Sequence, residues 1–164
     1  MRAFPLALLA ALPLAAVAKD NPDESFFHEA TQAGHAEVQA GQVAQRKATN
    51  PAVKEFAEMM VKDHTATNDT LGQIANSKGV ALPTGPSPAQ KAVNEKTRKQ
   101  NGSSFDKEYV QGQIKAHEDT VNLLQNEFDN GKDADAKAFA AQTLPKVKAH
   151  LDQIRKIAAS SGVE

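Results

Sequence analysis

Four long segments of this chain carry apolar side chains at alternating spacings of three and four residues. This period constrains the fold more than any other feature. The clearest example lies within residues 51–78, where one face presents Val53, Phe56, Met60, His64, Thr67, Leu71 and Ile74. Such a spacing lines up side chains on one stripe of an α-helix, which is normally buried against other helices. A similar period recurs in residues 25–48, 103–130 and 133–160. The chain is therefore predicted to be all-α.

The breaks between these segments divide the chain into two helical hairpins. Residues 49–51 and Gly131 are short interruptions of the kind that favour tight turns. The stretch 80–102 is longer, is rich in proline in its first half, and is expected to carry a short polar helix at about 88–99. A connection of this length could cross a bundle from end to end. We expect a ferritin-like four-helix bundle of two helical hairpins with a long connection containing a short extra helix. An up-down-up-down bundle with a long loop is the alternative.

Residues 1–18 are predicted to be a secretory signal peptide. Arg2 precedes an apolar stretch from Ala3 to Ala16, and Ala16-Val17-Ala18 is a small-x-small cleavage site. The alternative, a membrane anchor, is disfavoured because the stretch is short and rich in small residues. We expect export to the periplasm, a single domain over residues 19–164, and no integral membrane segment after cleavage.

Charge and cysteine content exclude several classes of function. The chain has 19 Lys and Arg against 20 Asp and Glu, for a net charge of −1 at pH 7. It therefore has no basic surplus to neutralise nucleic-acid phosphates. The absence of cysteine rules out disulfides, thiolate metal sites, lipid attachment at a cysteine and cysteine nucleophiles. No glycine-rich phosphate loop and no Gly-x-Ser-x-Gly motif occurs. The sequence leaves catalysis open and favours a non-catalytic role.

Four polar residues on apolar stripes form the candidate site. His64, His117 and His150 fall on the inward stripes of three predicted helices, and Glu37 falls on that of the fourth. Buried imidazoles and carboxylates cost free energy unless something satisfies them, so their convergence predicts a metal site. At about 1.5 Å per residue, Glu37 and His64 lie at the same height above their shared turn. The same count separates His117 from His150 by roughly 7–8 Å.

Imidazole and carboxylate ligands suit zinc, copper, iron, nickel or manganese. Because the set is rich in imidazole, we favour zinc or copper over iron. A metal-bound histidine normally donates its other ring nitrogen to an acceptor. Asp63, Glu118 and Asp119 stand beside the histidines in the sequence and are candidates for that role. Glu118 could also be a ligand itself.

Two other interpretations stay open. The buried groups could form a metal-free polar network that fixes helix register in a structural or protein-interaction module of the envelope stress response. A ferritin-like oxidase is disfavoured, because the Glu-x-x-His signature of di-iron bundles is absent. Val61 and Val147 occupy the positions three residues before His64 and His150.

Several short strings along the chain together match one protein family. They are Gly34-His35-Ala36-Glu37-Val38-Gln39-Ala40-Gly41, Asn50-Pro51-Ala52-Val53-Lys54-Glu55-Phe56-Ala57, Val61-Lys62-Asp63-His64, Phe105-Asp106-Lys107-Glu108-Tyr109, His117-Glu118 and Ala138-Phe139-Ala140-Ala141-Gln142-Thr143-Leu144-Pro145 through His150. On these strings the chain resembles the DUF4142 family of bacterial exported proteins over about Ser25 to Ala158.

The resemblance implies a ferritin-like four-helix fold in the periplasm or cell envelope. The family has no settled biochemical activity, so the resemblance implies fold and location rather than function. Glu37, His64, His117 and His150 occupy the family's usual positions for an inward glutamate and three histidines. His35 departs from the small or apolar residue expected at its position, so we leave it out of the site. The sequence thus predicts a periplasmic metal-binding bundle, linked to metal handling or envelope stress, and leaves any protein partner unknown.

Overall fold

The computed structural model of the chain describes residues 21–163 and confirms that this part is all-α. The helices are α1 (Glu24–Lys47), α2 (Pro51–Ser77), α3 (Pro88–Arg98), α4 (Gly102–Asn130) and α5 (Ala134–Ser161). All five lie within two residues of the predicted ranges. The predicted signal peptide, residues 1–18, lies outside the described residues.

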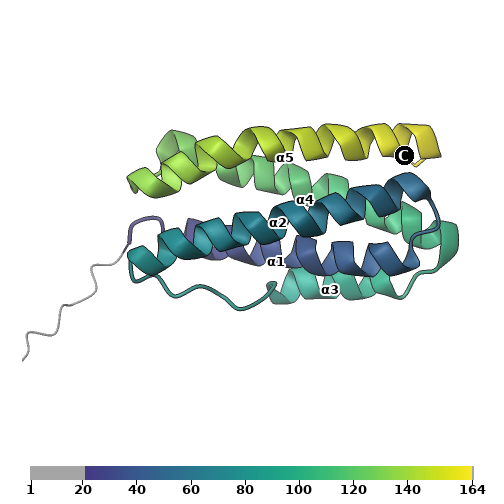
Figure 1. The fold of residues 1–164 in the computed structure, drawn as a ribbon, viewed down its shortest axis with the longest axis horizontal. Coiled ribbons are helices and arrows are strands. Elements are labelled where there is room, and N and C mark those ends of the chain that lie inside the picture. Colours follow the sequence, from purple (N-terminus) through teal and green to yellow (C-terminus); the bar gives the residue numbers. More distant parts are fainter. Residues whose placement is uncertain (1–20, 164) are drawn as a thin grey trace, which may run out of the picture.

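The four long helices form two antiparallel hairpins, as the sequence predicts. Helices α1 and α2 pack along each other, as do α4 and α5, while α1 contacts α4 and α2 contacts α5. The connection after α2 runs back along the bundle, with α3 lying against α1, and it delivers the chain to the far end where α4 begins (Figure 1). Helices α2 and α4 consequently run in the same direction (Figure 1). This is the one-crossover order and not the up-down-up-down alternative.

The hairpin turns are fixed by carboxylates of the opposite hairpin. Asp106 of α4 accepts hydrogen bonds from the backbone N–H groups of Thr49 and Asn50, at 3.0 and 2.9 Å, in the turn between α1 and α2. At the other end of the bundle, Asp23 accepts a hydrogen bond of 2.7 Å from the Lys132 N–H in the turn between α4 and α5. These bonds satisfy turn backbone groups and set the height of one hairpin relative to the other.

The core consists of two hydrophobic clusters, one toward each end of the bundle. The first lies near the α1–α2 turn and is built around Phe56, Met60, Phe105 and Ile154. The second lies near the α4–α5 turn and is built around Phe27, Leu71, Leu124 and Phe139. The candidate histidines fall between these clusters along their helices, so apolar packing encloses them from both ends.

One position of the predicted core is wrong. The apolar period of residues 103–130 predicts that Phe128 lies on the inward stripe, but its side chain is 46% exposed, while Glu127 beside it is buried. Near the end of α4 the neighbouring chain is the α4–α5 turn, whose backbone approaches Glu127 closely at Gly131. The partners available at a helix end, rather than the stripe alone, decide which side chain is covered.

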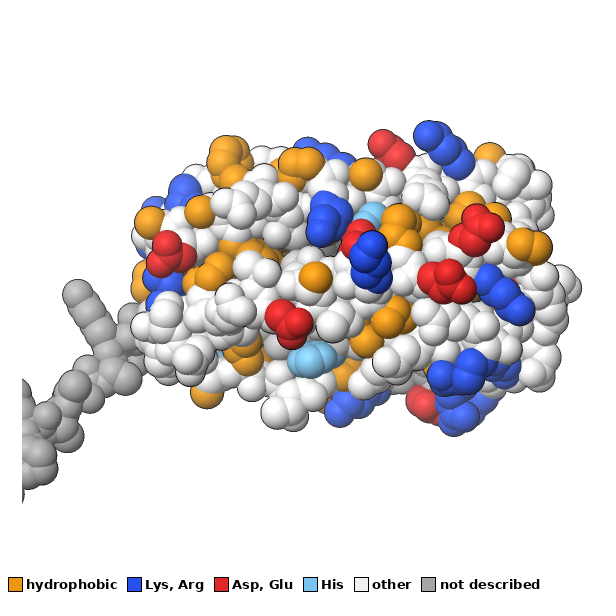
Figure 2. Space-filling view, viewed as in Figure 1, with side chains coloured by type: hydrophobic (Ala, Val, Ile, Leu, Met, Phe, Trp, Pro, Cys, Tyr) orange, Lys and Arg blue, Asp and Glu red, His pale blue; other side chains and the backbone are white. Residues whose placement is uncertain are grey.

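The surface carries both signs of charge. Figure 2 shows lysine, arginine, aspartate and glutamate side chains interspersed on one face of the molecule, without a basic field on that face. None of the helices in residues 21–163 is sufficiently long and apolar to cross a membrane.

Candidate metal centre

Three histidines from three helices meet in the interior of the bundle. His64 of α2, His117 of α4 and His150 of α5 are 7%, 1% and 4% exposed. Their ring centroids are 5.7–5.8 Å apart in all three pairs. One ring nitrogen of each lies within 4.8 Å of the corresponding nitrogens of the other two. The structure thus brings together the three histidines that the sequence singled out.

The separation predicted between His117 and His150 is larger than the one the structure shows. His117 lies 13 residues before the end of α4, and His150 lies 16 residues after the start of α5. The difference is three residues, or about 4.5 Å of helical rise, which side-chain reach can close. The sequence-based count was too large because it treated residues 131–133 as rising along the axis, whereas they cross from one helix to the next.

In two of the imidazoles, one ring nitrogen forms a hydrogen bond and the other keeps a free lone pair. His117 donates from Nδ1 to the backbone carbonyl of Gln113 at 2.9 Å. His150 donates from Nε2 to the Asp63 carboxylate at 3.0 Å. Because a carbonyl and a carboxylate accept but do not donate, these bonds place the protons on His117 Nδ1 and His150 Nε2. His117 Nε2 and His150 Nδ1 are buried without a hydrogen-bond partner, and so is His64 Nε2.

Of the three acidic residues proposed to orient the histidines, the structure assigns that position to Asp63 alone. Asp63 belongs to α2 and bonds His150 of α5, so it supports a histidine on another helix and not its own neighbour His64. Glu118 forms an ion pair with Arg155 at 2.7 Å, and Asp119 pairs with Lys115.

Burial favours the metal-binding form of two of the imidazoles, those of His64 and His150. Desolvation, with smaller contributions from the nearby His117, His150 and Lys146, lowers the pKa of His64 from 6.5 to about 3. Burial also lowers the pKa of His150, while the Asp63 carboxylate opposes that shift. A neutral imidazole offers a nitrogen lone pair, which is the ligand form of histidine.

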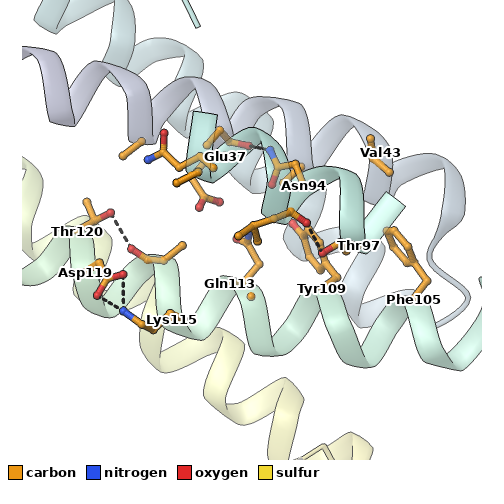
Figure 3. A pocket seen from close by; sticks show the side chains of 18 residues that line it. Glu37, Val43, Asn94, Thr97, Phe105, Tyr109, Gln113, Lys115, Asp119 and Thr120 are labelled. Atoms are coloured by element: carbon orange, nitrogen blue, oxygen red, sulfur yellow. Dashed lines mark hydrogen bonds and ion pairs between the residues drawn. The ribbon is translucent and has the colours of Figure 1, made fainter. Parts of the chain in front are cut away.

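Glu37 lies apart from the group of three. It comes from α1, is 5% exposed, and has an oxygen, Oε2, without a hydrogen-bond partner. The atoms close enough to share one ion belong to the three histidines and do not include this carboxylate. Burial raises the pKa of Glu37, while the nearby His117 and a hydrogen bond from the Gln113 side chain counteract the rise. Its side chain lines a pocket between α1, α3 and α4 (Figure 3).

Sequence reasoning missed several buried polar residues, two of which precede His117 on α4. Tyr109 and Gln113 are 2% and 4% exposed, and each has a polar atom without a hydrogen-bond partner. They stand eight and four residues before His117, so all three share one face of α4. That spacing was visible in the sequence, but an isolated tyrosine or glutamine at a helical position is commonly exposed.

The chain matches the family model "Domain of unknown function (DUF4142)" over residues 9–157. It belongs to the DUF4142 family. This confirms the resemblance seen in the sequence strings. No curated protein sequence matches the chain.

Solved structures share the fold of this DUF4142 protein at low sequence identity. A DUF305 fragment from Deinococcus radiodurans has a TM-score of 0.75 at 11% identity, over 85% of this chain and 97% of its own. A putative secreted DUF305 protein from Streptomyces coelicolor has the same TM-score and identity, over 88% and 94%. CopM in its Cu(II)-bound form has a TM-score of 0.71 at 16% identity, over 84% of this chain and 96% of its own. At these identities the likeness shows the fold alone.

Proposed function

We propose that this DUF4142 protein is an exported, non-catalytic bundle that binds one transition-metal ion through His64, His117 and His150. The observation that carries the proposal is the set of three buried imidazoles, each with a ring nitrogen that has no hydrogen-bond partner. Buried polar atoms are normally satisfied. A single cation coordinated by all three would satisfy them together.

The donor set fits zinc or copper better than iron. Three neutral imidazoles without a carboxylate or thiolate are borderline ligands that suit zinc and copper, whereas di-iron bundles use several carboxylates. The CopM structures, described as Cu(II)-bound and Cu(I)-bound, place copper among the ions held by bundles of this shape. We therefore propose copper first and zinc second. Asp63 and the Gln113 carbonyl would orient His150 and His117 on the ion.

Glu37 was predicted as a fourth ligand, and that role stays a prediction. The ligand atoms that lie within 4.8 Å of one another belong to the three histidines. We propose the three histidines as the ligands and Glu37 as a neighbour of His117. A Glu37→Gln variant separates the two possibilities, because a ligand's replacement weakens metal binding strongly and a neighbour's does not.

The experiment is a metal titration of the purified chain, stripped of metal with a chelator. Cu(I), Cu(II) and Zn(II) are added in turn, and stoichiometry is read by elemental analysis after desalting. We expect one ion per chain, lost in His117→Gln and retained in His35→Gln, which changes a partly exposed histidine outside the cluster. Absence of a bound ion, or equal binding by the two variants, would overturn the proposal. A metal-free module would then be the better interpretation.

Export rests on the leader predicted at residues 1–18. The putative secreted DUF305 protein of the same fold is consistent with such a location. Fractionation of cells that express the full chain tests this part of the proposal. We expect the protein in the periplasmic fraction, with its mature N-terminus at Lys19. Retention of the leader in the cytoplasm would refute it.

A further inference from the structure

A second candidate site lies outside the histidine cluster. A pocket of about 280 Å³ opens between α1, α3 and α4 (Figure 3). Its walls are mainly apolar and include Ala40 and Val43 from α1, Val93 from α3, and Phe105 and Ala116 from α4. This volume is close to the lower end of the range of about 300–1,000 Å³ typical of small-molecule sites.

Three buried polar atoms without hydrogen-bond partners belong to residues that line this pocket. They are Glu37 Oε2, Tyr109 OH and Gln113 Oε1, on side chains that are 5%, 2% and 4% exposed. Figure 3 shows Glu37 reaching in from α1 and Gln113 and Tyr109 from α4. Together they offer both donors and acceptors, because a tyrosine hydroxyl donates and an amide oxygen accepts. A ligand hydroxyl, which does both, is the smallest group that would satisfy them.

The charges around the pocket favour an uncharged ligand. Lys115 and Asp119 both line it, and they form an ion pair with each other. The rest of the wall is mainly apolar, so a charged ligand would lose its hydration there at a high cost in free energy.

The shape of the pocket favours a ring. The Phe105 and Tyr109 side chains, stacked on each other with centroids 6.0 Å apart, line one part of it. Gly112, one turn along α4, also lines it, and a Cβ added there would meet no atom within 4 Å. The space beside Gly112 is thus open and is bordered by aromatic and small side chains, which suit a flat apolar group.

Helix α3 covers the pocket loosely. Thr97 is its single buried residue. Its polar contacts with neighbouring helices include a hydrogen bond of 3.0 Å from the Asn94 side chain to the Ala36 carbonyl and an ion pair of 2.7 Å between Lys96 and Glu108. A helix held by so few buried contacts opens at low free-energy cost, which gives a small molecule a route to the interior.

We propose that this pocket binds a small uncharged aromatic alcohol, of which phenol is the simplest example. The ring would lie in the apolar part beside Phe105 and Gly112. The hydroxyl would bond the buried groups of Glu37, Tyr109 and Gln113. The proposal does not depend on the metal site.

The test is calorimetric titration of the metal-free full-length chain with phenol and, separately, with benzene. Benzene fills the apolar part but leaves the three polar atoms covered and unbonded, so it should bind at least about tenfold more weakly. Tyr109 is the only tyrosine of the chain. Protein labelled with 3-fluorotyrosine therefore gives one fluorine resonance, which should shift as phenol binds in the pocket.

Two pairs of variants keep the test independent of folding. Gly112→Leu should fill the pocket and weaken phenol binding at least about tenfold. Gly72→Leu, on α2 outside the pocket and also without an atom within 4 Å of the added Cβ, is the matched control and should bind as the original chain does. Glu37→Gln keeps a hydrogen-bonding group and should retain binding, whereas Glu37→Leu should lose it.

Equal affinity for phenol and benzene would overturn the role of the buried polar atoms. Binding that survives Gly112→Leu, or that leaves the fluorotyrosine resonance unmoved, would place the ligand elsewhere. The absence of phenol binding would overturn the proposal entirely. None of these outcomes bears on metal binding, because every titration is made without metal.

Discussion

The buried position of His64 predicts a specific dependence of stability on pH. Its pKa is about 3 in the folded chain, against 6.5 for a free imidazole, and burial is the largest cause. The unfolded chain therefore binds a proton at His64 below about pH 6.5 that the folded chain does not accept until about pH 3. Linkage then requires that the folded state lose stability as the pH falls through this window.

The magnitude follows from the two pKa values. One pKa unit corresponds to about 1.4 kcal/mol, so His64 alone should reduce the free energy of unfolding by about 2 kcal/mol between pH 7.5 and pH 5. The loss should reach about 3 kcal/mol at pH 4. His150 contributes with the same sign, because burial also lowers its pKa.

The assay is urea denaturation of the metal-free chain at several pH values, compared between the original protein and His64→Leu. Leucine has no titrating group, so the variant should lose about 2 kcal/mol less stability between pH 7.5 and pH 5. His35→Gln, a change outside the cluster, should keep the dependence of the original. If the original chain and His64→Leu lose stability in parallel, His64 is not held neutral by burial, and the argument for a neutral imidazole at this position fails.

Four further predictions concern residues that support the site and the bundle. Asp63→Asn should weaken metal binding about 10–100-fold, measured by competition with a chromogenic chelator, because His150 loses its charged hydrogen-bond acceptor. Gly41→Ala should destabilise the fold by about 1–3 kcal/mol in urea, because an added Cβ lies 2.9 Å from a side chain of α2. Gly72→Ala, whose Cβ has open space, should instead stabilise it by up to about 1 kcal/mol. Asp106→Asn should cost about 2–3 kcal/mol in the same assay, since a neutral amide accepts the turn's hydrogen bonds less well; an unchanged midpoint would show that the turn holds without this carboxylate.

The candidate site was largely predictable because helical periodicity carries three-dimensional information. Positions three and four residues apart share one face, so the inward direction of His64, His117 and His150 could be inferred from the apolar residues around them. Their common height was only partly predictable. The residues of the α4–α5 turn cross from one helix to the next and add little rise along the bundle axis. A count of residues along the sequence cannot distinguish such residues from helical ones.

The place of Glu37 shows where periodicity stops being informative. Its inward direction and its height were inferred correctly enough to bring it near His117, as their electrostatic interaction shows. Whether its carboxylate contributes to the histidine cluster or to the pocket between α1, α3 and α4 depends on where α3 packs. That helix is short and polar, so its own stripe says little about its position against α1 and α4.

By itself, the sequence determined the helices, their breaks and the identity of the interior imidazoles. These follow from local rules, since caps, breakers and a period of 3.6 act within a few residues. Tertiary structure alone decided that one nitrogen of each imidazole lies within 4.8 Å of the others, that Asp63 supports a histidine 87 residues away, and that a pocket opens beneath α3. Those outcomes depend on distances between helices that are remote in the chain, and such distances are set by how whole surfaces fit together.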